Sequence, residues 1–234
     1  MVNLIGKNLT AGYGGVDIIE NINLNVKEGE IVVIVGPNGA GKSTVMKSLL
    51  GMLSLTNGNV FFSDKEITTM LPQDRIKLGI GFVPQNQNVF TGMTVEENLE
   101  MGGFLRQDNI LDTIEEIYQL FPVLKEKRNQ NAGELSGGQR QQVAFGRALM
   151  TKPKILMLDE PTAGVSPIVM DDLFSRIIEV GKTGVGILMV EQNAKQALSI
   201  ADSGYVLVNG KNNREGTGKE LLNNPEVRKS FLGG

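Results

Sequence analysis

One glycine-rich segment limits the possible folds more than any other feature of this chain: Gly36-Pro37-Asn38-Gly39-Ala40-Gly41-Lys42-Ser43. Its spacing (a glycine, four residues, a glycine, then lysine and serine) is the pattern of a phosphate-binding loop. Such a loop lies between a buried strand and a helix, because its backbone N–H groups and the positive end of the helix must surround phosphate oxygens. The apolar run Ile31–Val35 precedes it and a helical pattern over Lys42–Met52 follows it. Residues 36–44, Thr44 included, are therefore predicted to bind a nucleotide; a chance glycine turn is the alternative.

Cysteine and histidine are both absent from the 234 residues. Their absence excludes disulfides, thiolate nucleophiles, histidine-dependent triads and every metal site that depends on sulfur or imidazole. Any catalysis must use carboxylates, lysine, hydroxyls, amides or a hard cation such as magnesium held by oxygen ligands. In the phosphate loop, Lys42 is predicted to reach the β- and γ-phosphates, and the Ser43 hydroxyl to ligate magnesium.

Charge and hydropathy give expectations about partners and location. The 23 basic and 26 acidic side chains leave a formal charge of −3, which argues against a nucleic-acid partner. No apolar run approaches the roughly 20 residues that span a bilayer. Residues 1–15 lack the basic segment and apolar stretch of a secretion signal. We therefore expect a cytoplasmic protein whose role at a membrane would come through a partner.

Short apolar runs bounded by turn residues predict buried parallel strands at Ile31–Val35, Ile155–Leu158 and Ile187–Val190. A helical pattern follows each of them, over Lys42–Met52, Pro167–Lys182 and Asn193–Ala201. This alternation predicts an α/β fold with a mainly parallel central sheet. Apolar and polar residues alternate from Asn21 to Val26, so the first thirty residues predict antiparallel strands.

A helical insertion is expected between the first and second of these strands, over about residues 86–150. Its helices are predicted at Thr94–Met101, Ile110–Phe121 and Ser136–Met150. We expect one domain over residues 1–234. In it, residues 1–85 and 151–234 would form the core with its antiparallel β subdomain, and residues 86–150 the helical subdomain.

Two adjacent carboxylates end the apolar run Ile155–Leu158: Asp159 and Glu160. At the end of a strand beside a phosphate loop, Asp159 is predicted to hold magnesium, directly or through water. Glu160 is predicted to polarise the attacking water, in a chain with no histidine for that task. Alone such a pair is weak evidence, because many buried strands end in an acidic turn.

A second candidate anion site is the segment Leu135-Ser136-Gly137-Gly138-Gln139, which opens a predicted helix. A serine N-cap followed by glycines leaves several N–H donors free to meet an anion. The alternative is a helix start that is simply capped.

The phosphate loop, residues 135–139 and the pair Asp159-Glu160 occur in the order and at the separations seen in the nucleotide-binding subunit of ABC transporters. The chain resembles that subunit over essentially its whole length. The resemblance implies a P-loop NTPase core, ATP and Mg²⁺ as cofactors, and ATP hydrolysis. In that family two cassettes meet head to tail, and each ATP lies between one subunit's phosphate loop and the other's signature. Residues 135–139 match that signature, so they are expected to contact the ATP of a partner cassette.

The resemblance also implies roles for single residues. Tyr13 takes the place of an aromatic ring that stacks on adenine; a turn tyrosine is the alternative. Gln85, after the strand-like Ile80–Val83, matches a glutamine that links magnesium and attacking water to the helical insertion; a solvated loop amide is the alternative.

Two positions depart from the family pattern. Gln192 stands where a histidine usually touches the γ-phosphate. Its amide can donate a hydrogen bond to the phosphate but carries no charge. The alternative is that Gln192 simply caps the following helix. Ser166 replaces a common aspartate after Glu160, which weakens inference about contacts between subunits.

Several segments narrow the resemblance to the ATPase subunits of Liv-type branched-chain amino acid importers. They are Met101-Gly102-Gly103, residues 145–150, Val190-Glu191-Gln192-Asn193 and the ending, residues 227–233. The resemblance implies partners: a second cassette, identical or related, transmembrane permease subunits, and indirectly a substrate-binding protein. It places the chain at the inner face of the membrane. Other cargoes (urea, lipid, lipopolysaccharide) and a weakly hydrolysing regulatory module are the alternatives.

A last hypothesis concerns the permease. Val89, Phe90, Phe104 and Leu105 are predicted to lie near a groove that receives a permease helix. Core packing within the insertion is the alternative.

Overall fold

The computed structural model describes residues 2–86 and 88–231; Leu232 and Gly233, part of the ending that resembles Liv-type subunits, lie outside the described residues. The strands are β1 (Asn3–Tyr13), β2 (Val16–Lys27), β3 (Ile31–Val35), β4 (Asn57–Phe62), β5 (Lys65–Glu66), β6 (Ile80–Val83), β7 (Ile155–Asp159), β8 (Gly186–Val190), β9 (Ser203–Val208) and β10 (Lys211–Thr217). The helices are α1 (Lys42–Leu50), α2 (Pro72–Leu78), α3 (Val95–Gly102), α4 (Leu111–Leu120), α5 (Pro122–Glu126), η1 (Ala132–Glu134), α6 (Gly137–Leu149), α7 (Pro167–Lys182), α8 (Ala194–Ile200), α9 (Gly218–Asn223) and α10 (Pro225–Phe231).

The larger sheet has the order β10-β9-β3-β8-β7-β6, and all its pairs are parallel except β10 with β9. Every residue of β3, β7 and β8 is buried, because helices cover both faces of the sheet. The predicted mainly parallel sheet is confirmed. Since the strands are parallel, the loops after β3, β6, β7 and β8 leave the sheet at one edge.

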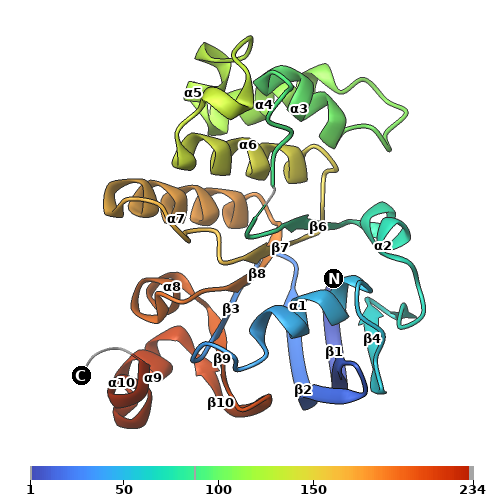
Figure 1. Ribbon diagram of the computed structural model, residues 1–234, viewed down its shortest axis with the longest axis vertical. Helices are drawn as coiled ribbons and strands as arrows, with labels where there is room; N and C mark the ends of the chain where they lie inside the picture. The colour runs from blue at the N-terminus through green and yellow to red at the C-terminus, as the bar shows by residue number, and fades with distance from the viewer. Residues whose placement is uncertain (1, 87, 232–234) are drawn as a thin grey trace.

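The smaller sheet is antiparallel, with the order β2-β1-β4-β5. Helix α1 lies between it and the larger sheet (Figure 1), and the apolar side chains of α1 join Val32 and Ile34 of β3 in one core cluster. Val33 and Val35 point to the opposite face of β3, where a second cluster includes Leu173 of α7. The alternation within five residues therefore places two cores on the two faces of one sheet.

Helices α3, α4, α5 and α6 form the upper part of the molecule in Figure 1, with α7 between them and the sheet. The six helices that the sequence predicts each form within two residues of the expected ends. Thr94 and Ser136 begin α3 and α6 with capping boxes, in which the side chain at the cap and the one three residues later satisfy each other's backbone N–H groups. No helix in the described part of the chain is long and apolar enough to cross a membrane.

Arg75 of α2 is a charged side chain inside the core, with 1% of its surface exposed. Its guanidinium donates hydrogen bonds to the carbonyl oxygens of Ser48 (3.2 Å) and Leu49 (2.6 Å), which belong to the last turn of α1. It also donates to the carbonyls of Thr68 (2.7 Å) and Met70 (3.0 Å). Burial lowers the pKa of Arg75 to about 10, so it keeps its charge at neutral pH. The cation thus satisfies the free carbonyl end of the helix that starts in the phosphate loop.

Replacing Arg75 with methionine is expected to lower the free energy of unfolding by about 2–4 kcal/mol, because buried carbonyls lose their donors. Arg128→Met is the matched control, since Arg128 is half exposed and forms only a 3.9 Å ion pair with Glu96; it should change stability by about 0.5 kcal/mol or less. Urea titration followed by circular dichroism measures both. Equal stabilities of the two variants would contradict this role of Arg75.

Candidate functional site

The loop between β3 and α1 has the conformation that its glycines allow. Gly39 and Gly41 have φ of +79° and +95°, in the left-handed region that residues with a side chain rarely adopt. A Cβ on Gly36 would lie 2.2 Å from the carbonyl oxygen of Leu207, so the chain passes too close to β9 for any side chain there. Gly41 directly precedes α1, so the first N–H groups of the helix face the loop.

Lys42 folds back over this loop and is buried. Its Nζ donates hydrogen bonds to the carbonyl oxygens of Gly36 (3.0 Å) and Pro37 (3.2 Å). The ammonium group of Lys42 is therefore held against the backbone of the phosphate loop, where it can meet an anion.

Ser43 and Asp159 come together across the end of the sheet. The Ser43 hydroxyl donates to Asp159 Oδ1 over 3.2 Å, although the residues are 116 positions apart. Burial raises the pKa of Asp159, and the hydrogen bond from Ser43 opposes that rise. A hydroxyl and a carboxylate oxygen side by side are ligands that suit Mg²⁺. No group of three Asp or Glu side chains that could hold a metal occurs within residues 2–86 and 88–231, so the protein alone offers few anionic ligands.

Glu160 and Gln85 form the second pair, from the ends of β7 and β6. Gln85 Nε2 donates to Glu160 Oε2 over 2.8 Å. Glu160 has φ +46°, an uncommon backbone conformation for a residue with a side chain. Its N–H donates to the carbonyl oxygen of Val190 (2.9 Å), and its own carbonyl accepts from Ala163 N–H (3.1 Å). This turn places the carboxylate where it accepts the hydrogen bond from Gln85.

A cavity of about 480 Å³ joins these groups. Its lining is residues 38–44 of the phosphate loop, Ile18 of β2, and Gln85, Glu160 and Gln192, which follow three neighbouring strands. The predicted site residues Gly36, Pro37 and Asp159 do not line it. Sequence reasoning missed only Ile18 of this set, because nothing separates it from the other apolar residues of β2.

Tyr13 does not line this cavity. It ends β1 with 49% of its surface exposed, and Lys47 Nζ of α1 lies 3.5 Å from its hydroxyl and 5.8 Å from its ring centre. Its ring is therefore half exposed, and it lies beside Lys47 in the last turn of the phosphate-loop helix.

Gln192 follows β8 with an exposed side chain, and it does not cap the next helix. Asn193 does so, because its Oδ1 accepts from Gln196 N–H. The side chain of Gln192 thus has no role in ending the strand or starting the helix.

Residues 135–139 lie apart from the cavity, since none of them lines it. Ser136 and Gln139 cap α6 through their mutual hydrogen bonds. A Cβ on Gly138 would lie 2.3 Å from Cγ1 of Val169 on α7, whereas a Cβ on Gly137 would meet nothing within 4 Å. The segment is both a capped helix start and an open surface at Gly137.

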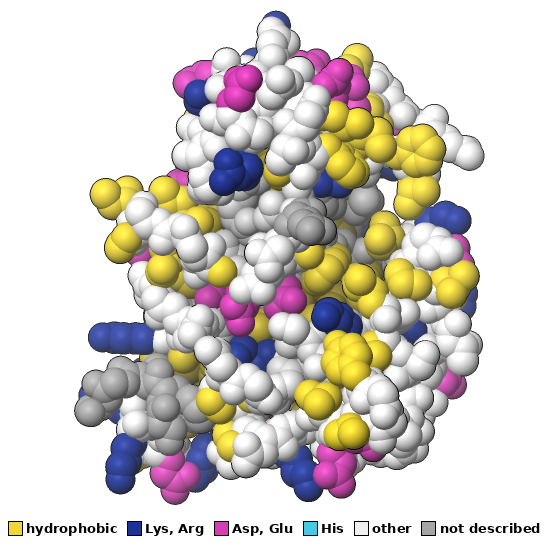
Figure 2. All heavy atoms as spheres, viewed as in Figure 1, with side chains coloured by type: hydrophobic (Ala, Val, Ile, Leu, Met, Phe, Trp, Pro, Cys, Tyr) yellow, Lys and Arg dark blue, Asp and Glu magenta, His cyan; other side chains and the backbone are white. Residues whose placement is uncertain are grey.

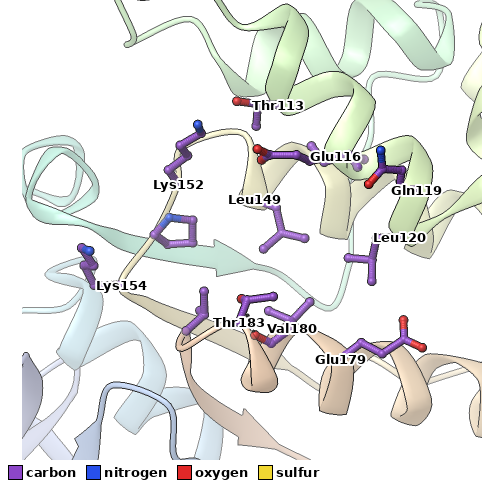
Figure 3. A pocket seen from close by; sticks show the side chains of 13 residues that line it. Thr113, Glu116, Gln119, Leu120, Leu149, Lys152, Lys154, Glu179, Val180 and Thr183 are labelled. Atoms are coloured by element: carbon purple, nitrogen blue, oxygen red, sulfur yellow. Dashed lines mark hydrogen bonds between the residues drawn. The ribbon is translucent and has the colours of Figure 1, made fainter.

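A larger cleft of about 690 Å³ lies between α4, the end of α6 and α7 (Figure 3). Leu120, Leu149 and Val180 line it together with charged side chains such as Lys152 and Glu179. It contains none of the residues predicted to bind nucleotide, so the phosphate-loop cavity is the candidate site.

Comparison with known proteins agrees with this geometry. The sequence model of the family described as ABC transporter matches residues 19–163. The high-affinity branched-chain amino acid transport ATP-binding protein BraG of Pseudomonas aeruginosa is 43% identical over 223 residues, which are 95% of this chain and 96% of that protein.

The chain belongs to the ABC transporter family. It is an ATP-binding cassette ATPase. A second relative, named probable branched-chain amino acid transport ATP-binding protein LivF, of Archaeoglobus fulgidus, is 41% identical over 227 residues and 96% of each chain. The crystal structure of a nucleotide-free ATP-binding cassette from an ABC transporter superimposes with a TM-score of 0.88 at 31% identity, over 100% of both chains. These findings confirm the predicted fold.

Proposed function

We propose that this cassette hydrolyses ATP to drive the import of branched-chain amino acids through a separate permease. One observation carries the catalytic part: Lys42, Ser43 and the Gln85–Glu160 pair line a single cavity, and Asp159 lies behind Ser43 at hydrogen-bond distance. The cargo is supported by the 43% and 41% identity to two relatives named for branched-chain amino acid transport.

In this proposal the phosphate loop, residues 36–44, and Lys42 hold the triphosphate, and Tyr13 stacks on the base. Mg²⁺ would be held by Ser43 and Asp159, with Gln85 beside them, and it would neutralise phosphate charge. A site with few protein carboxylates suits this ion, because Mg²⁺ usually keeps several waters and takes further ligands from the phosphates.

Glu160 orients and polarises the attacking water, and Gln85 fixes the direction of its carboxylate through the 2.8 Å hydrogen bond. Gln192 donates a hydrogen bond to the γ-phosphate. Being uncharged, it stabilises the transition state less than a protonated side chain would.

Glu160→Gln is expected to reduce ATP turnover at least about 100-fold, because the amide cannot accept a proton from water. ATP affinity should stay within a few-fold, and the variant should form a dimer at saturating ATP. Magnesium-dependent phosphate release, nucleotide binding and size-exclusion chromatography measure these properties.

Glu179→Gln is the control, since it makes the same change at an exposed carboxylate of α7 and should match the unmodified chain. Turnover that survives in Glu160→Gln would contradict the assignment. ATP binding without turnover in the unmodified chain would instead favour a partner cassette that completes the site.

A second cassette would complete the nucleotide site with its own residues 135–139. Residues 135–139 do not line the cavity of their own chain, so Leu135, Ser136, Gly137, Gly138 and Gln139 are proposed to contact the nucleotide of the partner. The open space at Gly137 fits this role, because a phosphate can approach the start of α6 only where no side chain stands.

Gly137→Ala tests this proposal without disturbing the fold, since the new Cβ meets no atom of its own chain within 4 Å. Alanine should keep or raise stability, by about 0.5 kcal/mol, through its higher helix propensity. Turnover should fall about tenfold or more, because the methyl group blocks the partner's phosphate. Gly138→Ala should instead destabilise the chain, since its Cβ would strike Val169. Unchanged turnover in Gly137→Ala would contradict a role for the signature in a dimer.

The permease is proposed to contact a groove of about 330 Å³ between the sheet, α3 and α6. Phe90, Met101, Phe104 and Leu105 line it and are all exposed apolar side chains. Figure 2 shows hydrophobic side chains gathered there, over α3 and the loop that follows it. Val89 differs from the other three predicted residues. It packs against the core cluster, which was the alternative, and does not line the groove.

Phe104 has 76% of its surface exposed, the most of the four apolar residues in the groove, so it is the best position for testing permease contact. Phe104→Glu should leave ATP binding unchanged and abolish co-purification with the permease, since a charge would be buried against an apolar helix. In cells, leucine uptake should fall to the level of a strain without this chain. Leu111→Glu, at an exposed position outside the groove, is the control. Normal co-purification of Phe104→Glu would place the permease elsewhere.

A further inference from the structure

Glu191 is a buried carboxylate, with 2% of its surface exposed, at the end of β8 and directly before Gln192. In the described part of the chain its carboxylate is met by hydrogen-bond donors and not by a lysine or arginine. Burial raises its pKa, and hydrogen bonds from Thr162 oppose that rise. A buried charge of this kind is costly unless its hydrogen bonds hold it in place.

The two oxygens of Glu191 hold two different segments. Oε1 accepts hydrogen bonds from the N–H and the hydroxyl of Thr162, at 3.0 Å and 2.7 Å. Oε2 accepts from the N–H of Gln192, at 3.0 Å. Thr162 is itself buried and lies two residues after Glu160. One side chain therefore joins the loop after β7 to the loop after β8.

Both of these loops reach the phosphate-loop cavity. Glu160 and Gln192 line that cavity, and they also line a neighbouring one of about 310 Å³ that Thr162 and Glu191 line. Glu160 has φ +46°, and a strained residue keeps its conformation only where its surroundings fix it. The link from Thr162 to Glu191 fixes the turn on its carboxyl side, while the bond from Glu160 N–H to Val190 fixes it on the other.

We propose that Glu191 is a positioning residue that holds Gln192 and the Glu160 turn in one fixed arrangement around the nucleotide. It does not touch the nucleotide, and it acts through the backbone of Gln192 and through Thr162. The inference rests on the proposed function, because it presumes that Gln192 and Glu160 act on ATP.

Glu191→Gln tests the proposal with the smallest change in shape. If the amide oxygen stays with Thr162, the amide NH₂ faces the N–H of Gln192, so two donors meet and that bond is lost. The expected result is a fall in kcat of about tenfold or more, with KM for ATP within about twofold. Glu179→Gln should leave both constants unchanged.

A double-mutant cycle separates positioning from general stability. In a Gln192→Ala background, Glu191→Gln should reduce kcat less than it does alone, because the Gln192 side chain, one of the two groups that Glu191 positions, is already gone and only the Glu160 turn still loses support. Thr162→Val, which removes one hydroxyl bond and leaves the carboxylate, should lower kcat by a smaller factor. Losses that simply multiply in the cycle would overturn the proposal, as would an unchanged kcat in Glu191→Gln.

Hydrogen–deuterium exchange gives a readout that does not depend on ATP turnover. In Glu191→Gln the segments around residues 161–164 and 190–193 should both exchange faster, with no change elsewhere in the sheet. Unchanged exchange in either segment would overturn the link. If turnover survives in Glu160→Gln while both segments respond as expected in Glu191→Gln, the proposed catalytic role fails and the link between the two loops stands. Thr162→Val provides the same measurement if Glu191→Gln does not fold.

Discussion

The parallel pairing of β6, β7, β8 and β3 determines where every loop of the candidate site lies. Parallel strands all end at the same edge of a sheet, so one geometric fact brings four loops together. The strands themselves are buried on both faces and have no polar side chains to offer until their ends. Gln85, Glu160 and Gln192 therefore each lie within two residues of the last apolar residue of a strand.

Hydrogen bonds between these loops then decide how the groups face one another. Ser43 bonds to Asp159, Gln85 to Glu160, and Glu191 to both Thr162 and Gln192. Apart from the bond between the neighbours Glu191 and Gln192, each of these bonds joins segments from different strands. The site is therefore fixed by its own polar contacts as well as by the sheet. A chain without histidine and cysteine depends on such oxygen and amide groups for all of its chemistry.

The pattern of apolar residues along the sequence predicted much of the fold. The strands β3, β7 and β8 are continuous apolar runs, and α7 has the predicted ends because Pro167 begins it. The elements that sequence reasoning missed are short or mixed in pattern, such as α2, β5, β9 and β10. Arg75 could not be placed in the core from sequence, because its burial depends on four carbonyls from separate segments.

The phosphate loop, the carboxylate pair and the glycine-rich start of α6 can each be recognised in the sequence, because each is a local pattern with a characteristic spacing. Which of them meet depends on how the strands pair and where the helices pack. Lys42, Asp159 and Gln85 converge because parallel strands end together, whereas Gly137 lies apart from that cavity and faces open space. The role of Glu191 was equally hidden, since nothing local distinguishes it from an exposed acid beside Gln192. Burial and long-range hydrogen bonds exist only after the strands have paired.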